Sequence, residues 1–246
     1  MRVTRIFTAQ ALSIDAVLEL EPEPSRHIAR ALRMVAGDGI TLFDGRGGEY
    51  PAVITAVGKH AVTVRTSDHL PGLAESPLAI HLGIALSRGE RMDWVMQKAT
   101  ELGVACITPL RTEHCAVKLT AERAEKKLRH WQQVVNSACE QSGRCRVPAV
   151  EAIATLEEWT QGTQAERRLI LDPGAADSDT GPAPHSVALL VGPEGGFSTA
   201  EIATAGAAGF SALRLGPRVL RTETAPLAAI AVLQGRWGDM QPGGSA

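Results

Sequence analysis

Two short segments in the last third of the chain carry residues typical of a ligand site. The first is Gly192-Pro-Glu-Gly-Gly196 and the second is Leu215-Gly-Pro-Arg-Val-Leu-Arg-Thr-Glu223, and each lies between an apolar, strand-like run and a helix-like pattern. Glycine allows a tight turn or a close approach to a small molecule, with backbone N–H and C=O groups left to bind it. Either segment alone is more often an ordinary strand-to-helix turn. Two segments of like construction could meet over one ligand.

Three charged side chains in these segments could perform chemistry. Arg221 offers a planar fork of donors for negative charge that develops on a substrate, and Glu194 or Glu223 could accept a proton. Structural roles stay open as alternatives. Arg221 could pair with Glu223 or cap a helix, and Glu194 could satisfy N–H groups where a helix begins. The sequence therefore leaves the identity of any general base undecided.

Both segments resemble one family, and the resemblance extends over nearly the whole chain. It also includes LFDGRGGEY at 42–50, LSRGERMDWVMQKATELGV at 86–104 and ACEQSGRCRVP at 138–148. These motifs are similar to the RsmE type of the SPOUT class, which are S-adenosylmethionine-dependent RNA methyltransferases. The resemblance implies methylation of N3 of one uridine in 16S ribosomal RNA of the small subunit. Because N3 lies on the pairing edge, the target base must be unpaired or extruded.

The resemblance also implies a fold and a cofactor pocket. It implies an α/β protein with a C-terminal SPOUT domain, which has a parallel sheet and a trefoil knot, and a small N-terminal PUA-like β-barrel. S-adenosylmethionine would lie bent in the knot, held mainly by backbone groups of Leu171, Gly192, Pro193, Gly196, Leu215, Gly216 and Leu220. Asp172 departs from the pattern, because relatives carry histidine at this strand end. The family further implies a homodimer, to which a final helix with Leu227, Ile230, Leu233 and Trp237 would contribute.

Periodicity predicts the same two-part organisation. Residues 1–72 read as short strands around Val3–Ile6, 40–42, 54 and 62–64 with one helix over 25–34, and turn residues place a boundary near 73. Residues 73–246 alternate strands, at 80–86, 105–110, 168–172, 186–191 and 212–215, with helices. Serines 87 and 198 open capping boxes, a helix spans 120–141, and the last helix begins near 222–226. Such alternation predicts a parallel sheet covered on both faces. Residues 173–185 read as a mobile loop.

Composition limits the class of protein. The 246 residues are 44% hydrophobic and carry a net charge of −2. There is no signal-like N-terminus and no apolar run long enough to span a membrane, so we expect a soluble, cytoplasmic protein without a membrane partner. Cysteines 106, 115, 139 and 145 form no CxxC pair, so no metal site or disulfide is expected, and Cys106 reads as core. GxGxxG and GxxxxGK[ST] are absent, which disfavours an ordinary Rossmann methyltransferase and a P-loop enzyme.

Basic residues that could contact RNA are spread over several segments. The net charge is zero over 1–70, +3 over 71–150 and −5 over 151–246, so the basic excess lies in the middle. A local basic face can bind phosphates even in a nearly neutral protein. The predicted RNA contacts, for which solvated surface is the alternative, are Arg5, His27, Arg30, Arg33, Arg46, Lys126, Lys127, Arg144 and Arg146.

Two other functions stay open at this stage. One is a SPOUT enzyme that methylates a ribose 2′-hydroxyl or another base. The other is a non-catalytic RNA-binding assembly factor, which the intact glycines and Arg221 disfavour because such a protein would need no cofactor pocket. The sequence gives neither the RNA position that is methylated nor the assembly stage of the substrate.

Overall fold

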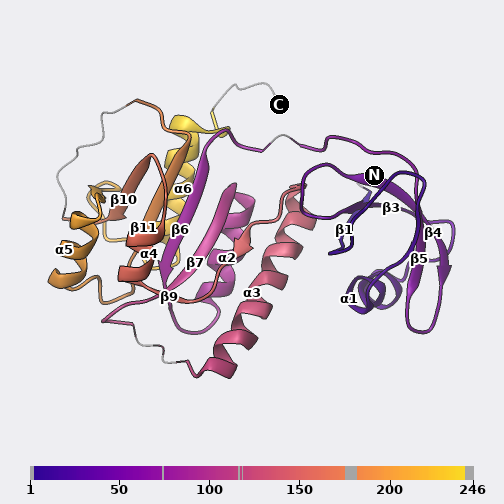
Figure 1. Ribbon diagram of the computed structural model, residues 1–246, viewed down its shortest axis with the longest axis horizontal. Helices are drawn as coiled ribbons and strands as arrows, with labels where there is room; N and C mark the ends of the chain where they lie inside the picture. The colour runs from indigo at the N-terminus through magenta and orange to yellow at the C-terminus, as the bar shows by residue number, and fades with distance from the viewer. Residues whose placement is uncertain (1–2, 74, 116, 118, 175–181, 242–246) are drawn as a thin grey trace. The chain divides into compact units, whose positions relative to one another are not determined.

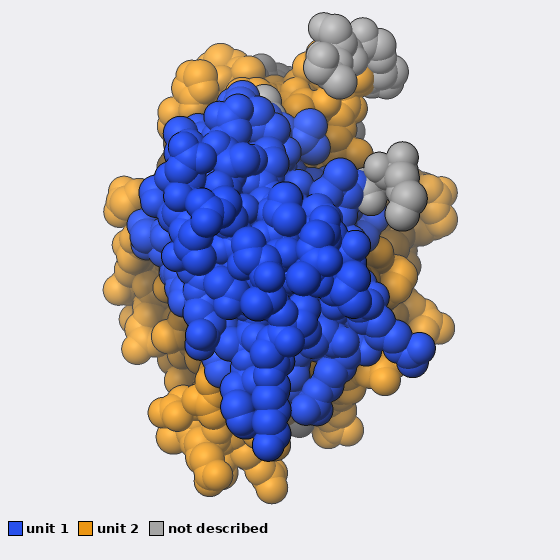
Figure 2. All heavy atoms as spheres, turned by 90° about the vertical axis from the view of Figure 1, so that its right-hand side faces the viewer, with its two compact units in different colours: residues 1–75, 136–147 blue, residues 76–135, 148–246 orange. Residues whose placement is uncertain are grey.

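The chain folds into two units, of which the N-terminal one contains a sheet of five short strands. The computed structural model describes residues 3–241 except 74, 116, 118 and 175–181. The chain divides into two units, the first of 1–75 and 136–147 and the second of 76–135 and 148–246, which Figure 2 distinguishes by colour. Among the described residues, no helix combines the length and the apolar character needed to cross a membrane.

The first unit is built on strands that bury alternate side chains. Its strands are β1 (Thr4–Phe7), β2 (Val17–Glu19), β3 (Gly39–Phe43), β4 (Tyr50–Val57) and β5 (Val62–Thr66), in the order β1-β3-β4-β5-β2. β1 pairs with β3 in parallel, and the other pairs are antiparallel. Ile6, Leu42, Ile54 and Val64 are fully buried in its core. The period-2 pattern therefore predicted β1, β3, β4 and β5, but it did not predict β2, which contains only three residues.

The helical segment of this unit differs from its prediction. α1 (Pro22–Arg26) runs into a π-helical turn, His27–Ala31, whereas a single helix over 25–34 was expected. Pro22 fits the first turn of a helix because its missing N–H has no partner there. Arg33 lies beyond the helix with φ +54. Ser25 is used inside the unit: its hydroxyl donates to Leu20 O at 2.9 Å and accepts from the N–H of Val62 at 3.0 Å.

A stretch far along the sequence completes the first unit. Asn136–Val147 cluster with the N-terminal residues, which the predicted division at residue 73 does not include. The Glu140 carboxylate accepts the N–H of Phe7 at 2.9 Å, and Cys145 O accepts the N–H of Gly47 at 3.1 Å. Burial raises the pKa of the Glu140 carboxyl. Through these contacts with Phe7 and Gly47, the stretch belongs to the first unit.

The second unit contains the predicted parallel sheet. Its strands are β6 (Ala79–Ala85), β7 (Val104–Arg111), β8 (Ala149–Val150), β9 (Ala154–Thr155), β10 (Arg167–Leu171), β11 (Ser186–Val191) and β12 (Ser211–Leu213). These seven strands form one sheet. Six of them follow the order β12-β10-β11-β6-β7-β8, and β9 pairs with β7. All of these pairs are parallel. The carboxyl ends of the strands consequently meet at one edge (Figure 1).

Helices cover both faces of this sheet. α2 (Arg91–Glu101) and α6 (Thr224–Trp237) contact each other and the central strands on one face, and α4 (Leu156–Gly162) and α5 (Thr199–Ala207) lie on the other (Figure 1). α3 (Ala121–Ser142) follows β7. Trp159 packs so closely on Gly83 that a Cβ there would lie 2.7 Å from the indole. Both faces are thus buried, as predicted.

Local signals at helix starts were correct in one place and wrong in another. The capping box at Ser198 is confirmed: its hydroxyl accepts the N–H of Glu201 at 3.2 Å, and the Glu201 carboxylate accepts the N–H of Ser198 at 2.9 Å. The expected capping box at Ser87 is wrong, because α2 begins only at Arg91 and Gly89 has φ +68. The predicted loop 173–185 falls mainly outside the described residues.

The last helix offers less surface to a partner than its sequence indicated. Ile230 and Leu233 are buried within this chain, at 0% and 2% exposure. They pack inside the second unit and are not available to a second subunit. Val232 is 53% exposed. It is the apolar side chain of α6 that faces solvent most clearly, and it was not among the residues expected to contribute.

Candidate active site

A cavity of about 620 Å³ lies beyond the carboxyl ends of β10, β11 and β12. This is the edge at which parallel sheets hold their ligands. It has the size of a typical site for a small molecule, roughly 300–1,000 Å³. All ten residues predicted for cofactor binding and catalysis line it: Leu171, Gly192, Pro193, Glu194, Gly196, Leu215, Gly216, Leu220, Arg221 and Glu223. The two glycine-containing segments therefore form one site.

Glycine is needed in the walls of this cavity for reasons visible in the backbone. Gly196 and Gly216 have φ of +70 and +73, a region that side chains disfavour. The N–H of Gly196 donates to Pro193 O at 2.9 Å and closes a tight turn. A Cβ on Gly196 would meet no atom within 4 Å and would point into open space. A ligand can therefore approach this backbone closely.

Apolar side chains line the deeper part of the cavity. Ile170, Val191 and Phe210 are buried and belong to its wall. Such a surface suits the flat faces of a heterocycle, while the backbone groups of the turns can bind its polar edges. Asp172 also lines the cavity, and its carboxylate accepts the N–H of Gly174 at 2.8 Å. This contact assigns Asp172 to a turn after β10.

Arg91 joins the two glycine-containing segments through their carboxylates. Its guanidinium pairs with Glu194 from the first segment, and its Nε lies 3.7 Å from the Glu223 carboxylate of the second. Arg91 is the first residue of α2 and lines the cavity. Sequence reasoning missed it, because both of its partners lie more than a hundred residues further along the chain. Its position in a motif shared with the family was the signal that could have identified it.

Arg221 has its side chain on the cavity and its backbone in the start of a helix. Its carbonyl accepts the N–H groups of Thr224 and Ala225, each at 2.9 Å. The alternative of an ion pair with Glu223 is not observed, because Glu223 lies beside Arg91. Among the described residues, the Arg221 guanidinium forms no ion pair. It is available for negative charge on a bound molecule.

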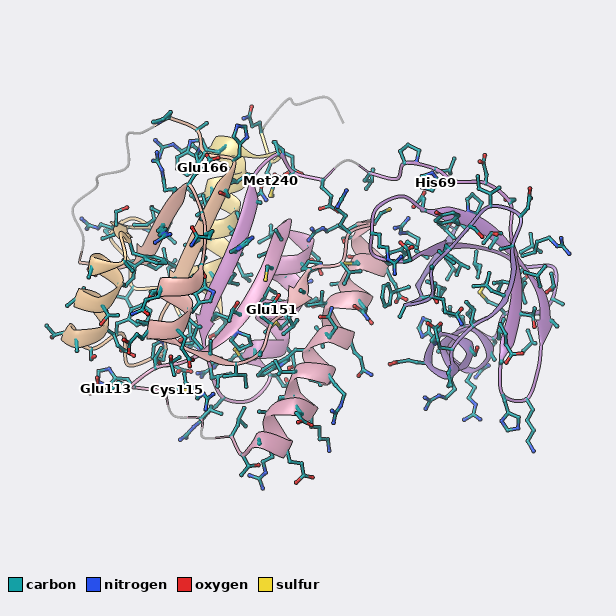
Figure 3. All side chains as sticks on the ribbon, viewed as in Figure 1. His69, Glu113, Cys115, Glu151, Glu166 and Met240 are labelled. Carbon is teal, nitrogen blue, oxygen red and sulfur yellow. The ribbon has the colours of Figure 1, made fainter. Side chains whose placement is uncertain are left out.

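The segment after β7 contacts the turn that contains Gly196, although the residues that line the cavity do not include it. His114 Nδ1 lies 3.1 Å from Gly196 O, and the N–H of Glu113 donates to the Glu201 carboxylate at 2.8 Å. Cys115 donates to Leu86 O at 3.1 Å. Figure 3 labels Glu113 and Cys115 at this edge of the sheet. These contacts fix the turn that contains Gly196 from outside.

The predicted RNA contacts divide into exposed and buried side chains. The Arg5 side chain is only 10% exposed; it pairs with Glu49 and donates to Arg144 O at 3.2 Å. Arg144 is 12% exposed and holds the Glu75 carboxylate at 2.6 Å. A buried guanidinium needs such partners, so the structure gives both arginines a structural role. The exposed members are His27, Arg30, Arg33, Arg46, Lys126 and Arg146. Lys127 is half-buried and lies over the Trp131 ring at 5.8 Å.

The cysteines show no sign of a reactive thiol in this site. Burial raises the pKa of Cys106 and that of Cys139 to about 12, so both stay protonated near neutrality. Cys106 is only half-buried, which corrects its assignment to the core. Its thiol faces Glu151 at 3.8 Å.

Comparison with known proteins places this architecture in a class. The model of the RNA methyltransferase domain matches residues 74–234, and that of the RNA methyltransferase PUA domain matches residues 20–67. The ribosomal RNA small subunit methyltransferase E of Buchnera aphidicola is 35% identical over 242 residues, which cover 97% of this chain and 98% of that protein. The chain belongs to the ribosomal RNA small subunit methyltransferase E family.

Two solved structures resemble the whole chain. A methyltransferase from Legionella pneumophila in complex with the cofactor SAM has a TM-score of 0.94 and 45% identity, and covers 97% of this chain and 100% of its own. The ribosomal RNA small subunit methyltransferase E of Neisseria gonorrhoeae, bound to S-adenosyl methionine, has a TM-score of 0.90 and 40% identity, with 98% and 100% covered.

Proposed function

We propose that this protein transfers the methyl group of S-adenosylmethionine to N3 of one uridine in 16S ribosomal RNA of the small subunit. The observation that carries the proposal is one cavity lined by all ten predicted residues, nine from the two glycine-containing segments and Leu171 from β10. Its apolar depth and backbone-lined turns fit an adenosine. Relatives that match nearly the whole chain are named as methyltransferases and hold this cofactor.

Each of the ten predicted residues then has a role in binding or in chemistry. Leu171, Leu215 and Leu220 would enclose the cofactor together with the backbone of Gly192, Pro193, Gly196 and Gly216. The cofactor supplies a methyl group on a sulfonium sulfur. N3 of the uracil attacks that carbon from the side opposite the sulfur, which keeps the electron pair of the broken bond. The proton of N3 must leave before or during this step.

Arg221 and the carboxylates divide the remaining chemistry. The guanidinium of Arg221, which lines the cavity, would stabilise the negative charge that spreads to O2 and O4 of the uracil as N3 loses its proton. Glu194 and Glu223 are the candidate proton acceptors. Arg91 holds both carboxylates at the rim of the cavity. It would keep them on the side from which the RNA base enters.

The other parts of the proposal concern the assembly. Residues 1–72, completed by residues 136–147, would form a PUA-like barrel that holds RNA, and the rest of residues 73–246 a SPOUT domain whose C-terminal segment is knotted around the cofactor. The family resemblance supports the knot, a homodimer and a cytoplasmic location with the ribosome. The RNA contacts would come from the exposed basic residues His27, Arg30, Arg33, Arg46, Lys126 and Arg146, with Lys127 beside Trp131.

Mass spectrometry of 16S ribosomal RNA from a deletion strain tests the function. One N3-methyluridine should be lost and should return when the purified protein and S-adenosylmethionine are added to small subunits of that strain. Loss of a ribose methyl group or of another methylated base would favour the alternative SPOUT activity. Intact methylation, together with no cofactor binding by calorimetry, would favour an RNA-binding assembly factor.

A further inference from the structure

Two arginines from distant parts of the sequence lie opposite each other in the first unit. Arg46 follows β3 and Arg146 follows α3, and the two form an isolated antiparallel bridge. The flanking hydrogen bonds run from the N–H of Gly47 to Cys145 O at 3.1 Å and from the N–H of Val147 to Gly45 O at 3.2 Å. This pattern defines a non-hydrogen-bonded pair, in which two opposite side chains leave on the same face and approach most closely.

Both arginines line a cleft of about 440 Å³. Its floor is the backbone of Gly47 and Gly48, and His69, labelled in Figure 3, stands at its wall. The Arg146 guanidinium lies across Gly47, since a Cβ there would be 3.4 Å from its Nε. A Cβ on Gly48 would collide with the His69 imidazole. The two glycines thus make room for the basic side chains above them.

The acidic residues near this cleft have other partners. Glu75 lines it, but its carboxylate holds Arg144 at 2.6 Å and accepts the N–H of Arg146 at 3.3 Å. Asp44 accepts the N–H of Arg46 at 3.1 Å, and Asp68 accepts that of His69 at 2.7 Å. In the part of the chain that the structure describes, neither the Arg46 nor the Arg146 guanidinium forms an ion pair.

The positive charges of Arg46 and Arg146 repel each other in this arrangement. Like charges directly opposite across an antiparallel pair are destabilising. An anion between two guanidinium groups would reverse the sign of this interaction, and a phosphate fits the donor fork of arginine. The cleft is open, and it belongs to the unit whose residues 20–67 match the RNA methyltransferase PUA domain. A phosphate that is part of a polynucleotide can enter an open cleft of this kind.

We propose that Arg46 and Arg146 together bind one backbone phosphate of the RNA substrate, with His69 as a third polar contact. This inference rests on the proposed function and specifies how the first unit holds RNA. It joins two of the predicted contacts into one site and adds a histidine. It also separates them from Arg5 and Arg144, which hold carboxylates nearby.

Salt titrations of RNA binding test the shared phosphate. The full-length protein and the variants Arg46→Ala, Arg146→Ala and the double variant would be titrated with fluorescein-labelled decauridylate at several salt concentrations. For single strands the slope of log affinity against log salt is about −0.7 per neutralised phosphate. If one phosphate is shared, each single variant and the double variant should lose about 0.7 of slope. Arg146→Lys, which keeps the charge, should keep most of the slope.

A matched control removes a charge elsewhere on the same unit. Arg65 is exposed on β5, and Arg65→Ala should leave the slope unchanged. Melting temperatures of all variants verify that they are folded. His69→Gln should weaken binding with the slope retained.

Three outcomes would overturn the inference. Slopes equal to that of the unaltered protein would mean that the cleft does not contact RNA. A loss in the double variant twice that of each single variant would mean two separate phosphates. Equal competition by inorganic phosphate and by unlabelled decauridylate, at the same phosphate concentration, would indicate a small-anion site. S-adenosylmethionine binding and methylation by the unaltered protein are measured in parallel, so that failure of the proposed function is recognised separately.

Discussion

Replacing Arg91 by alanine should weaken the binding of S-adenosylmethionine although Arg91 itself need not touch the cofactor. Its guanidinium is the contact that joins Glu194 of one glycine-containing segment to Glu223 of the other. Without it, the two segments lose a link that holds them in the binding geometry before the cofactor arrives. Binding of the cofactor must then also order the two segments, and the free energy that this ordering costs lowers the affinity.

The exposure of the three side chains limits the size of this effect. The side chains of Arg91 and Glu194 are 42% and 41% exposed, and that of Glu223 is 22% exposed. Ion pairs of this kind contribute about 0.2–1 kcal/mol each, so two of them amount to about 0.4–2 kcal/mol. Because about 1.4 kcal/mol corresponds to a factor of ten, the affinity should fall about 2- to 30-fold.

Isothermal titration calorimetry measures this effect, and a double-mutant cycle assigns it. Glu194→Gln should weaken cofactor binding less than Arg91→Ala, and adding Glu194→Gln to Arg91→Ala should cost little more, because the link is already broken. Arg91→Lys keeps the charge and should restore part of the affinity. Additive losses in the cycle, or an Arg91→Ala protein that binds the cofactor as tightly as the original, would refute the reasoning.

Three further predictions concern single residues. Arg221→Ala should lower the single-turnover methylation rate on the order of 10²–10³-fold with little change in cofactor affinity; an unchanged rate would assign Arg221 to the helix start alone. Gly196→Val should abolish cofactor binding in calorimetry, whereas Gly37→Val, at φ +98 and away from the cavity, should share its backbone strain and keep the affinity. Burial raises the pKa of the Glu140 carboxyl in the folded protein, so its ionised form opposes folding and stability falls as the pH rises through that pKa. Glu140→Gln should therefore melt higher than the original near pH 8, and this advantage should shrink on acidification; a constant difference across the pH range would contradict the assignment.

The sequence predicted the features of the cavity that depend on local chemistry. Glycine and proline between a strand and a helix indicate a turn that must approach something, and parallel strands bring such turns to one edge. Residues 192–196 and 215–223 therefore fell in one site, as the cavity shows. Arg91 was missed because its partners, Glu194 and Glu223, are more than a hundred residues away. No local pattern encodes such a contact.

The other differences between the predicted and the observed structure have two causes, which are contacts between distant residues and very short strands. Asn136–Val147 enter the first unit through contacts with Phe7 and Gly47, which no periodicity in a helix-forming stretch reveals. β8 and β9 contain two residues each, too few for an alternation of period 2. A chain that begins near residue 73 would lack the partners of Glu140 and Cys145. Point substitutions in the full chain therefore test RNA binding better than removal of residues 1–72 would.

The glycine-lined wall of the cavity has a consequence for inhibition of this enzyme. A compound that competes with the cofactor by using the backbone around Gly192, Gly196 and Gly216 would leave little scope for resistance mutations. A side chain at Gly196 would enter the open space that we propose for the cofactor, and one at Gly192 would press on Phe197, 3.0 Å away. The change that excludes the drug would also stop the reaction. Selectivity between relatives would have to come from the rim, where Arg91 and Arg221 give an extended compound charged groups to reach.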